Sequence, residues 1–334
     1  MRIAILAPLR FPIAEPYYGG LEMHTHLLGQ ELLRQGHEVT LFAHPDSDPS
    51  FNLQPIGLAE NANFIEQSFA FGRAMRGIVD GNFDVVHNNS IHYLPPLSAG
   101  KLFCRMVTTL HTPPYKALRW GGRITRSANH TFVSISAHLH EVWRPYIGQH
   151  EVVHNGLDGT KWPLNLQPEP GTAVWYGRFT PEKGAEYAIA AAQRAGYRLT
   201  LAGPVYDEGY FAQKIRPELG GNITYAGHLN QTDLAELIGR SAVGLVTSVW
   251  EEPFGLVYVE MPACGTPVAA FASGAATEVV LPETGTIVAK RDTVALAQVL
   301  GKLSGHDRQK CRQAALAKFS LQRMVEGYLQ LYRS

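Results

Sequence analysis

The sequence of 334 residues has few cysteines, no excess charge of either sign and no long hydrophobic run. Its three cysteines, Cys104, Cys264 and Cys311, are widely spaced and form no CxxC pair, which argues against a disulfide framework or a zinc knuckle and favours a reducing cytoplasm. Lysine plus arginine number 29, as do aspartate plus glutamate, so no overall field attracts nucleic acid or an anionic membrane. Any site for an anion must therefore be local.

Membrane-spanning segments are not expected either, because no apolar stretch approaches the roughly 20 residues that a bilayer requires. The apolar run at residues 3–7 is too short for a signal peptide and is interpreted as a buried first strand. We expect a cytoplasmic protein, with at most a weak peripheral contact at the inner membrane surface.

Short β-rich runs alternate with helical patterns along the chain, as in parallel sheets covered by helices on both faces. The clearest helix spans residues 21–35, with apolar residues at helical spacing and Gly36 as its C-terminal stop. The strands expected in the first half lie at residues 2–7, 38–43, 84–87, 106–110, 131–134 and 151–153.

Residues 156–171 are rich in Gly, Pro, Asn and Asp without a sustained period, which predicts a linker. The sequence therefore predicts an α/β protein of two Rossmann-like, doubly wound domains, residues 1–155 and 172–312. Ligands of such sheets lie beyond the carboxyl ends of the strands, so two facing sheets would form a cleft. Residues 313–334, the end of a helical pattern that begins at 307, can cross back to the first domain. The strands expected in the second half lie at residues 173–177, 197–202, 222–226, 243–247, 266–270 and 286–288.

The segment 246–268 contains two acids that can border one pocket. After a strand, Glu252 follows in a loop, and residues 253–255 are expected to open a helix whose first N–H groups can bind an anion. Glu260 lies on that helix, and both carboxylates can accept hydrogen bonds from vicinal hydroxyls. The alternative is that Glu251 and Glu252 only favour the positive end of the helix dipole, while Glu260 lies on a solvated face.

Two cations flank the start of another predicted helix, at residues 184–195. Arg178 directly follows a strand that ends at Gly177, and Lys183 precedes the helix. The helix dipole disfavours cations there by a few tenths of a kcal/mol to about 1 kcal/mol, so they need another reason to be present. A diphosphate supplies one, because arginine binds its oxygens in a fork and lysine adds a point charge. The alternative is a surface pair that flanks a turn.

The first half offers glycines and a histidine near expected strand ends. Gly19 and Gly20 precede a helix after a long loop and permit close backbone approach to a ligand, although a flexible turn is the alternative. The loop is not GxGxxG, which argues against a nicotinamide site. His111 directly follows a strand, so its imidazole is expected at the carboxyl end of the sheet. Less specific candidates at strand ends or at the domain junction are His87, Ser134, Ser136, His154 and Asn155.

These segments resemble the retaining glycosyltransferases of family four. Glu252 and Glu260, with seven residues between them, are similar to that family's E-x7-E signature. The Cys-Gly-Thr-Pro-Val run at 264–268 and the G-R-x(4)-K-G pattern around Arg178 and Lys183 are similar to further family motifs, and the motifs follow family order over nearly the whole chain. The resemblance implies a GT-B fold and transfer of a sugar from a UDP or GDP type of nucleotide-diphosphate sugar, with retention of anomeric configuration.

The resemblance also implies a role for each motif residue. Glu252 would contact the donor sugar and Glu260 the nucleotide ribose, with no separate nucleophile and no required metal or cofactor. The acceptor, whether a sugar, a lipid-linked molecule or another small molecule, is not identified by the sequence. The other implied site residues are Arg178, Lys183 and the backbone of Phe254, Gly255 and Leu256 for the sugar and diphosphate, Gly19 and Gly20 near the diphosphate and acceptor, and His111 beside the sugar.

Two further patterns indicate different chemistry. Residues 46–48 spell D-x-D, which binds a metal and sugar nucleotide in another glycosyltransferase fold, but their Pro and Ser-rich surroundings favour a surface loop. Cations at helical spacing beside Trp120 could form a face for lipid headgroups or a phosphorylated acceptor, the alternative being a solvated face. These cations are Lys116, Arg119, Arg123 and Arg126.

Three rival functions stay open from the sequence. A sugar-nucleotide epimerase of the same two-domain plan would consume donor without an acceptor, although the E-x7-E segment argues against it. A non-catalytic nucleotide-sugar-binding subunit would keep the pocket and lose turnover. A dehydrogenase would bind a nicotinamide cofactor.

Overall fold

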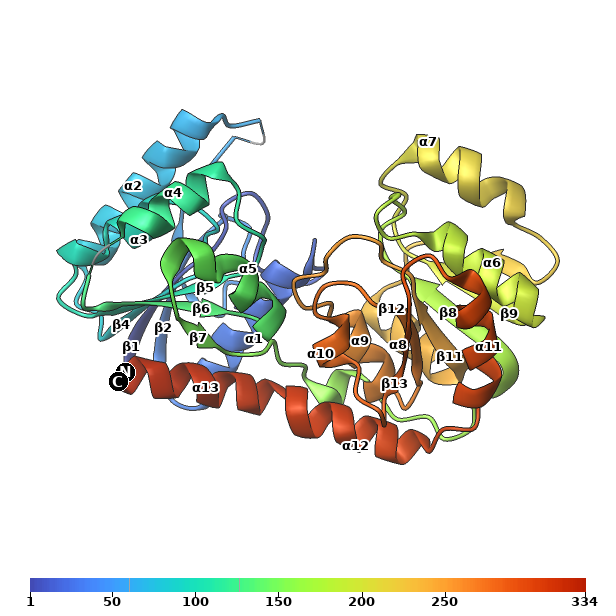
Figure 1. The fold of residues 1–334 in the computed structure, drawn as a ribbon. Helices are drawn as coiled ribbons and strands as arrows, with labels where there is room; N and C mark the ends of the chain where they lie inside the picture. The colour runs from blue at the N-terminus through green and yellow to red at the C-terminus, as the bar shows by residue number, and fades with distance from the viewer. Residues whose placement is uncertain (60, 126) are drawn as a thin grey trace. The chain divides into compact units, whose positions relative to one another are not determined.

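A computed structural model of the chain describes residues 1–59, 61–125 and 127–334 (Figure 1). They form two compact units, one of residues 1–156 with 321–334 and one of residues 157–320. Every described strand pair in either sheet is parallel, which confirms the predicted pair of parallel α/β sheets. In this described part of the chain, no helix combines the length and the apolar character needed to cross a bilayer.

The first unit has a seven-stranded sheet in the order β3-β2-β1-β4-β5-β6-β7, with a core on each face. Alternation along the first strand explains the two layers, because Ile3 and Ile5 pack with α1 and α13, whereas Ala4 and Leu6 pack with α2. The strands are β1 Arg2–Leu6, β2 Glu38–Ala43, β3 Asn52–Pro55, β4 Val85–Asn88, β5 Arg105–Leu110, β6 His130–Ser134 and β7 Glu151–Val152. The helices are α1 Gly20–Arg34, α2 Phe64–Asp80, α3 Leu94–Leu97, α4 Lys116–Ile124, α5 Ala137–Ile147 and α13 Leu321–Arg333.

The second unit has a six-stranded sheet in the order β10-β9-β8-β11-β12-β13. Its core is rich in alanine along α6, which lets this helix lie close to the sheet. The strands are β8 Glu169–Tyr176, β9 Arg198–Ala202, β10 Ile223–Tyr225, β11 Ser241–Val246, β12 Val268–Phe271 and β13 Gly285–Val288. The helices are α6 Ala185–Ala195, α7 Glu208–Tyr210, α8 Gln231–Arg240, α9 Val257–Ala263, α10 Ala276–Val279, α11 Thr293–Leu303 and α12 Arg308–Phe319.

The structure adds one strand that the sequence did not predict and lengthens another. β3 pairs with the edge of β2, and its mostly exposed polar residues and its proline show no apolar alternation. β8 begins at Glu169, and Leu157 forms a bridge with Ser320, so much of the expected linker is packed into the second unit.

The prediction of one continuous C-terminal helix is wrong. Ser320 is extended, with φ −75° and ψ 152°, and separates α12 from α13. The helix α12 groups with the second unit, while α13 groups with the first and packs beside α1 (Figure 1). A serine between two helices is a common start signal for the second, and this signal was available in the sequence.

Candidate active site

The order of the second sheet reverses between β8 and β11, which are adjacent although β9 and β10 lie between them in the chain. In such sheets the ligand crevice lies beyond the carboxyl ends of the strands at this reversal. The loop after β8 carries Arg178 and Lys183, and the loop after β11 carries Glu252. The fold therefore brings both predicted motifs to the place where a ligand is expected.

Lys183 and Glu252 form an ion pair at this point, the ammonium Nζ donating to the carboxylate Oε1. Glu252 is buried and Lys183 is largely so. The two loops are also tied together, since Val249 N–H donates to the Glu182 carbonyl at 2.9 Å and Thr247 Oγ1 to the Gly184 carbonyl at 2.7 Å. These bonds fix the two loops relative to each other, so the loop backbones bring the Lys183 and Glu252 side chains together.

A third loop, which follows β12, supports Glu252 from behind. Ala275 N–H donates to the Glu252 carbonyl at 2.9 Å, and Gly274 N–H donates to a Glu251 carboxylate oxygen at 2.6 Å. Gly274 has φ +56°, and a Cβ there would lie well under 3.0 Å from the backbone N and O of Glu252. Only glycine fits this position, and sequence reasoning missed it because the contact joins distant loops.

Glu260 of α9 is buried, and the Tyr176 hydroxyl donates to its Oε2 at 2.5 Å. The alternative of a solvated face is therefore wrong. Burial raises the pKa of the Glu260 carboxyl to about 7, and the bond from Tyr176 opposes the rise. Tyr176 was missed, although its alternation with the core residue Trp175 at the end of β8 could have marked it.

The helix after Glu252 begins at Val257 rather than at Gly255, which corrects the predicted start. Gly255 has φ +80°, a left-handed conformation that no α-helix contains. Phe254 is fully buried, with its ring edge-on to Phe319 at 5.6 Å between centroids. Its side chain thus anchors the loop, and what residues 254–256 can offer a ligand is their backbone.

Arg178 is exposed, with its guanidinium carbon 5.4 Å from the centre of the Tyr206 ring. Such a stack orients the planar fork of an arginine without using its N–H groups. The predicted cation therefore keeps its donors available for an anion.

The reversal in the first sheet lies between β1 and β4, and the glycine loop and the histidines gather there. Gly19 precedes α1, which begins at Gly20. His111, at the end of β5, shares Asn89 Oδ1 with His87, each through Nε2 at 3.0 Å. His24 of α1 packs edge-on against His111 at 4.7 Å between ring centroids.

Hydrogen bonding fixes which nitrogen of His111 carries the proton. Thr25 Oγ1 donates to the Leu21 carbonyl at 2.9 Å, so it must accept from Asn89 Nδ2 at 3.1 Å. Asn89 Oδ1 then faces both histidines and can only accept, so Nε2 of His87 and of His111 are both protonated. The Nδ1 atom of His111 is therefore a lone-pair acceptor.

Burial keeps these histidines neutral. It lowers the pKa of His24 to about 4 and that of His87 to about 3, and it holds the pKa of His111 well below its usual value. Hydrogen bonds connect these histidines to α13. The Tyr332 hydroxyl meets His87 Nδ1 at 2.7 Å, and the Thr109 hydroxyl bonds both His87 and Tyr328. The sequence did not predict that His24, Asn89, Tyr328 and Tyr332 would surround His87 and His111.

The weaker candidates have structural roles where the structure describes their contacts. Ser136 Oγ accepts from Leu139 N–H at 3.0 Å and caps α5, and Ser134 Oγ bonds His150 at 2.7 Å. Asn155 is buried and interacts with the imidazole of His24. In the D-x-D segment, for which a surface loop was predicted, the Asp48 carboxylate is hydrogen-bonded to His26 and Gln30 of α1.

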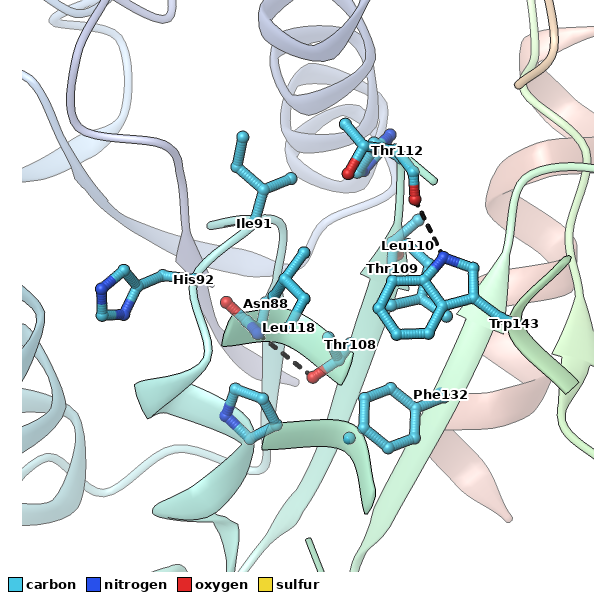
Figure 2. Close-up of a pocket in the computed structure, with 13 residues that line it drawn as sticks. Asn88, Ile91, His92, Thr108, Thr109, Leu110, Thr112, Leu118, Phe132 and Trp143 are labelled. Atoms are coloured by element: carbon cyan, nitrogen blue, oxygen red, sulfur yellow. Dashed lines mark hydrogen bonds between the residues drawn. The ribbon is translucent and has the colours of Figure 1, made fainter. Parts of the chain in front are cut away.

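A small cavity lies beside the histidines, between β4, β5 and the helices α4 and α5 (Figure 2). Trp143 donates to the Thr112 carbonyl at 2.9 Å across it, and Asn88 donates to Thr108 at 3.1 Å (Figure 2). Its volume of about 20 Å³ suits one water and not a sugar ring. This cavity is therefore too small for the sugar that the family resemblance implies.

Comparison with known proteins agrees with this arrangement. A model of the family Glycosyl transferases group 1 matches residues 159–317, and one of Glycosyltransferase Family 4 matches residues 18–161. A glycogen synthase of Mycobacterium tuberculosis is 28% identical over 376 aligned positions, which cover 94% of this chain and 91% of that protein. A phosphatidyl-myo-inositol mannosyltransferase of Propionibacterium freudenreichii subsp. shermanii is 29% identical over an alignment that covers 81% of this chain and 77% of that protein.

The fold is shared with the crystal structure of Anabaena HepE in complex with UDP, at a TM-score of 0.77, 17% identity and 99% coverage of both chains. The two family matches follow one another along nearly the whole sequence. The chain therefore belongs to the family-four, group 1 retaining glycosyltransferases, enzymes that transfer a sugar from a nucleotide-sugar donor.

Proposed function

We propose that the protein moves a sugar from a UDP or GDP sugar onto a glycan, lipid-linked or small-molecule acceptor, with retention of anomeric configuration. The observation that carries the proposal is the Lys183–Glu252 ion pair at the sheet reversal, with the buried Glu260 on the adjoining helix. A lysine has three donors, so Lys183 can hold Glu252 and a phosphate oxygen together. This arrangement would couple the sugar contact to the diphosphate contact.

In the proposed reaction the acceptor hydroxyl oxygen bonds to the anomeric carbon as the bond from that carbon to the diphosphate oxygen breaks. The bonding electrons stay on the diphosphate, which takes the hydroxyl proton on the same face. Lys183, Arg178 and the backbone N–H groups of residues 254–256 would stabilise the developing charge. Glu252 would orient the sugar without attacking it.

We propose for the first unit the roles that the family resemblance implies, with Gly19 and Gly20 allowing close backbone approach of the diphosphate and acceptor and His111 facing the sugar. The neutral His111 would accept a hydrogen bond from a sugar hydroxyl through Nδ1, the tautomer supported by its bond to Asn89. No metal or other cofactor enters these steps.

The comparisons support a chemical class for the donor and the acceptor, and not one particular compound. The UDP bound to HepE supports a uridine donor, while the names of the relatives, glycogen synthase and phosphatidyl-myo-inositol mannosyltransferase, indicate acceptors of different chemistry. We place the reaction in the cytoplasm, which suits the free thiols of Cys104, Cys264 and Cys311.

A donor screen tests the proposal. A UDP or GDP sugar should raise the melting temperature, because it binds only the folded state, and should yield a product of unchanged anomeric configuration, read by NMR, once an acceptor is added. Conversion of the donor to an epimer without acceptor would contradict transfer. Tight binding with no turnover on a broad acceptor panel would instead indicate the non-catalytic subunit.

Affinity for the donor should depend on the ionisation of Glu260. The ribose hydroxyls donate, so they favour the ionised carboxylate, and a pKa of about 7 means that this form increases as pH rises from 6 to 8. If only that form binds, the Kd should fall by up to about tenfold over this range. Calorimetry with a nucleotide sugar, whose diphosphate has no titration near neutrality, measures the effect.

The matched variant is Glu260→Gln, which removes the titration and keeps the side chain nearly isosteric. Its Kd should be constant over the same pH range and close to the weak low-pH value of the wild type. An identical pH dependence in both proteins would exclude Glu260 as the titrating group.

A further inference from the structure

The first unit presents an exposed apolar surface that the proposed chemistry does not use. In this unit α2 packs against α3, and α3 packs against α4 (Figure 1). Large apolar side chains on these helices remain exposed, 69% for Phe69 and 55% for Trp120. We call this surface the aromatic strip: Phe64, Ile65 and Phe69 of α2, Tyr93 before α3, and Trp120 and Ile124 of α4.

Ring contacts make the strip continuous from one helix to the next. The Phe64 ring stacks on Tyr93 at 5.3 Å between centroids, and Tyr93 meets Trp120 edge-on at 6.0 Å. Gly121 allows this approach, because a Cβ there would lie 2.9 Å from Tyr93 Cβ. Ile65 and Phe69 are one helical turn apart and extend the strip along the outward side of α2.

A basic strip borders the aromatic one on the α5 side of α4. It consists of Lys116, Arg119 and Arg123, and both guanidinium groups lie over the Tyr146 ring, at 5.5 and 5.2 Å from its centre. These cations lie one turn apart, so they share one side of the helix. The fourth cation predicted for this face, Arg126, lies outside the described residues.

Acidic groups do little to offset the basic strip. The helix α4 contains no acid. On α2, Glu66 is used at the helix start, where it accepts from Asn63 N–H at 2.7 Å, and Asp80 is at the opposite end. On α5, Glu141 is paired with Arg144 at 2.8 Å. Among the described residues, the surface therefore combines exposed aromatic rings with positive charge that few neighbouring acids offset.

We propose that this surface docks onto an anionic phospholipid bilayer. Tryptophan, tyrosine and phenylalanine prefer the interface between headgroups and acyl chains, while adjacent arginine and lysine attract anionic headgroups. Charge complementarity favours this occupant over a second copy of the chain, whose identical basic strip would repel. The inference concerns α2, α3 and α4 alone and does not depend on the proposed transfer reaction.

Vesicle co-sedimentation tests the proposal with the full chain. Binding to phosphatidylglycerol-containing vesicles should exceed binding to pure phosphatidylcholine vesicles at least tenfold and should weaken as salt is added. The variant Lys116→Glu/Arg123→Glu should lose at least tenfold in this binding. Phe69→Ser/Trp120→Ser should lose a similar amount while keeping its weak salt-dependent attraction.

The matched control is Lys214→Glu/Lys302→Glu, which changes the net charge equally on the second unit and should bind as the wild type does. Melting temperatures establish that each variant is folded. Equal binding to both vesicle types, or an equal loss in the control, would overturn the proposal. So would a dimer on gel filtration that the Phe69→Ser/Trp120→Ser variant abolishes, since the strip would then bind another copy.

Discussion

Replacing Lys183 by alanine is expected to lower sugar transfer at least tenfold, about 1.4 kcal/mol or more of activation free energy. The ammonium would neutralise charge on the departing diphosphate, a contribution that exists mainly in the transition state. Its removal also leaves the buried Glu252 carboxylate without its partner. The measurement is kcat/KM with a purified donor and acceptor, beside a thermal melt to establish that the fold is kept.

Glu252→Ala should lower transfer by at least the same factor, and the double variant separates two roles for Lys183. If Lys183 only holds Glu252, the double variant should be no slower than Glu252→Ala. If it also contacts the diphosphate, the double variant should be slower still. Arg198→Ala is the control, because it breaks an exposed ion pair with Glu169 at the amino ends of β9 and β8, away from the carboxyl ends where the ligand is expected. Wild-type rates in Lys183→Ala or Glu252→Ala would refute the site assignment.

The sequence predicted the architecture because hydrophobic periodicity is a local signal. Alternating β-rich and helical runs correctly indicated two parallel sheets, and the confirmed family follows from motifs that are each contiguous. The strand β3 was not predicted, because this exposed edge strand has no alternating apolar pattern. The break at Ser320 was missed because the apolar residues keep a helical period on both sides of it.

The contacts within the site were less predictable because they depend on strand order. Lys183 and Glu252 are 69 residues apart, and nothing local shows that β11 lies beside β8. Tyr176 illustrates the same limit, since its partner Glu260 is 84 residues away. The position of His111 at a strand end was predicted from the sequence, but its protonated nitrogen follows from Asn89, whose orientation only the hydrogen bonds determine.

Gly274→Ala should reduce transfer at least tenfold although it alters no group that touches a ligand. The new Cβ would collide with the backbone of Glu252, so the loop carrying this carboxylate must move, and a shift of about 1 Å can cost about 10²-fold in rate. Gly196→Ala is the matched control, because Gly196 has φ +70° but nothing within 4 Å of the added Cβ. Both variants share the left-handed strain of about 1 to 2 kcal/mol, so equal melting temperatures with an activity loss confined to Gly274→Ala would identify the displaced Glu252. Equal activity in the two variants would show that transfer tolerates movement of this loop.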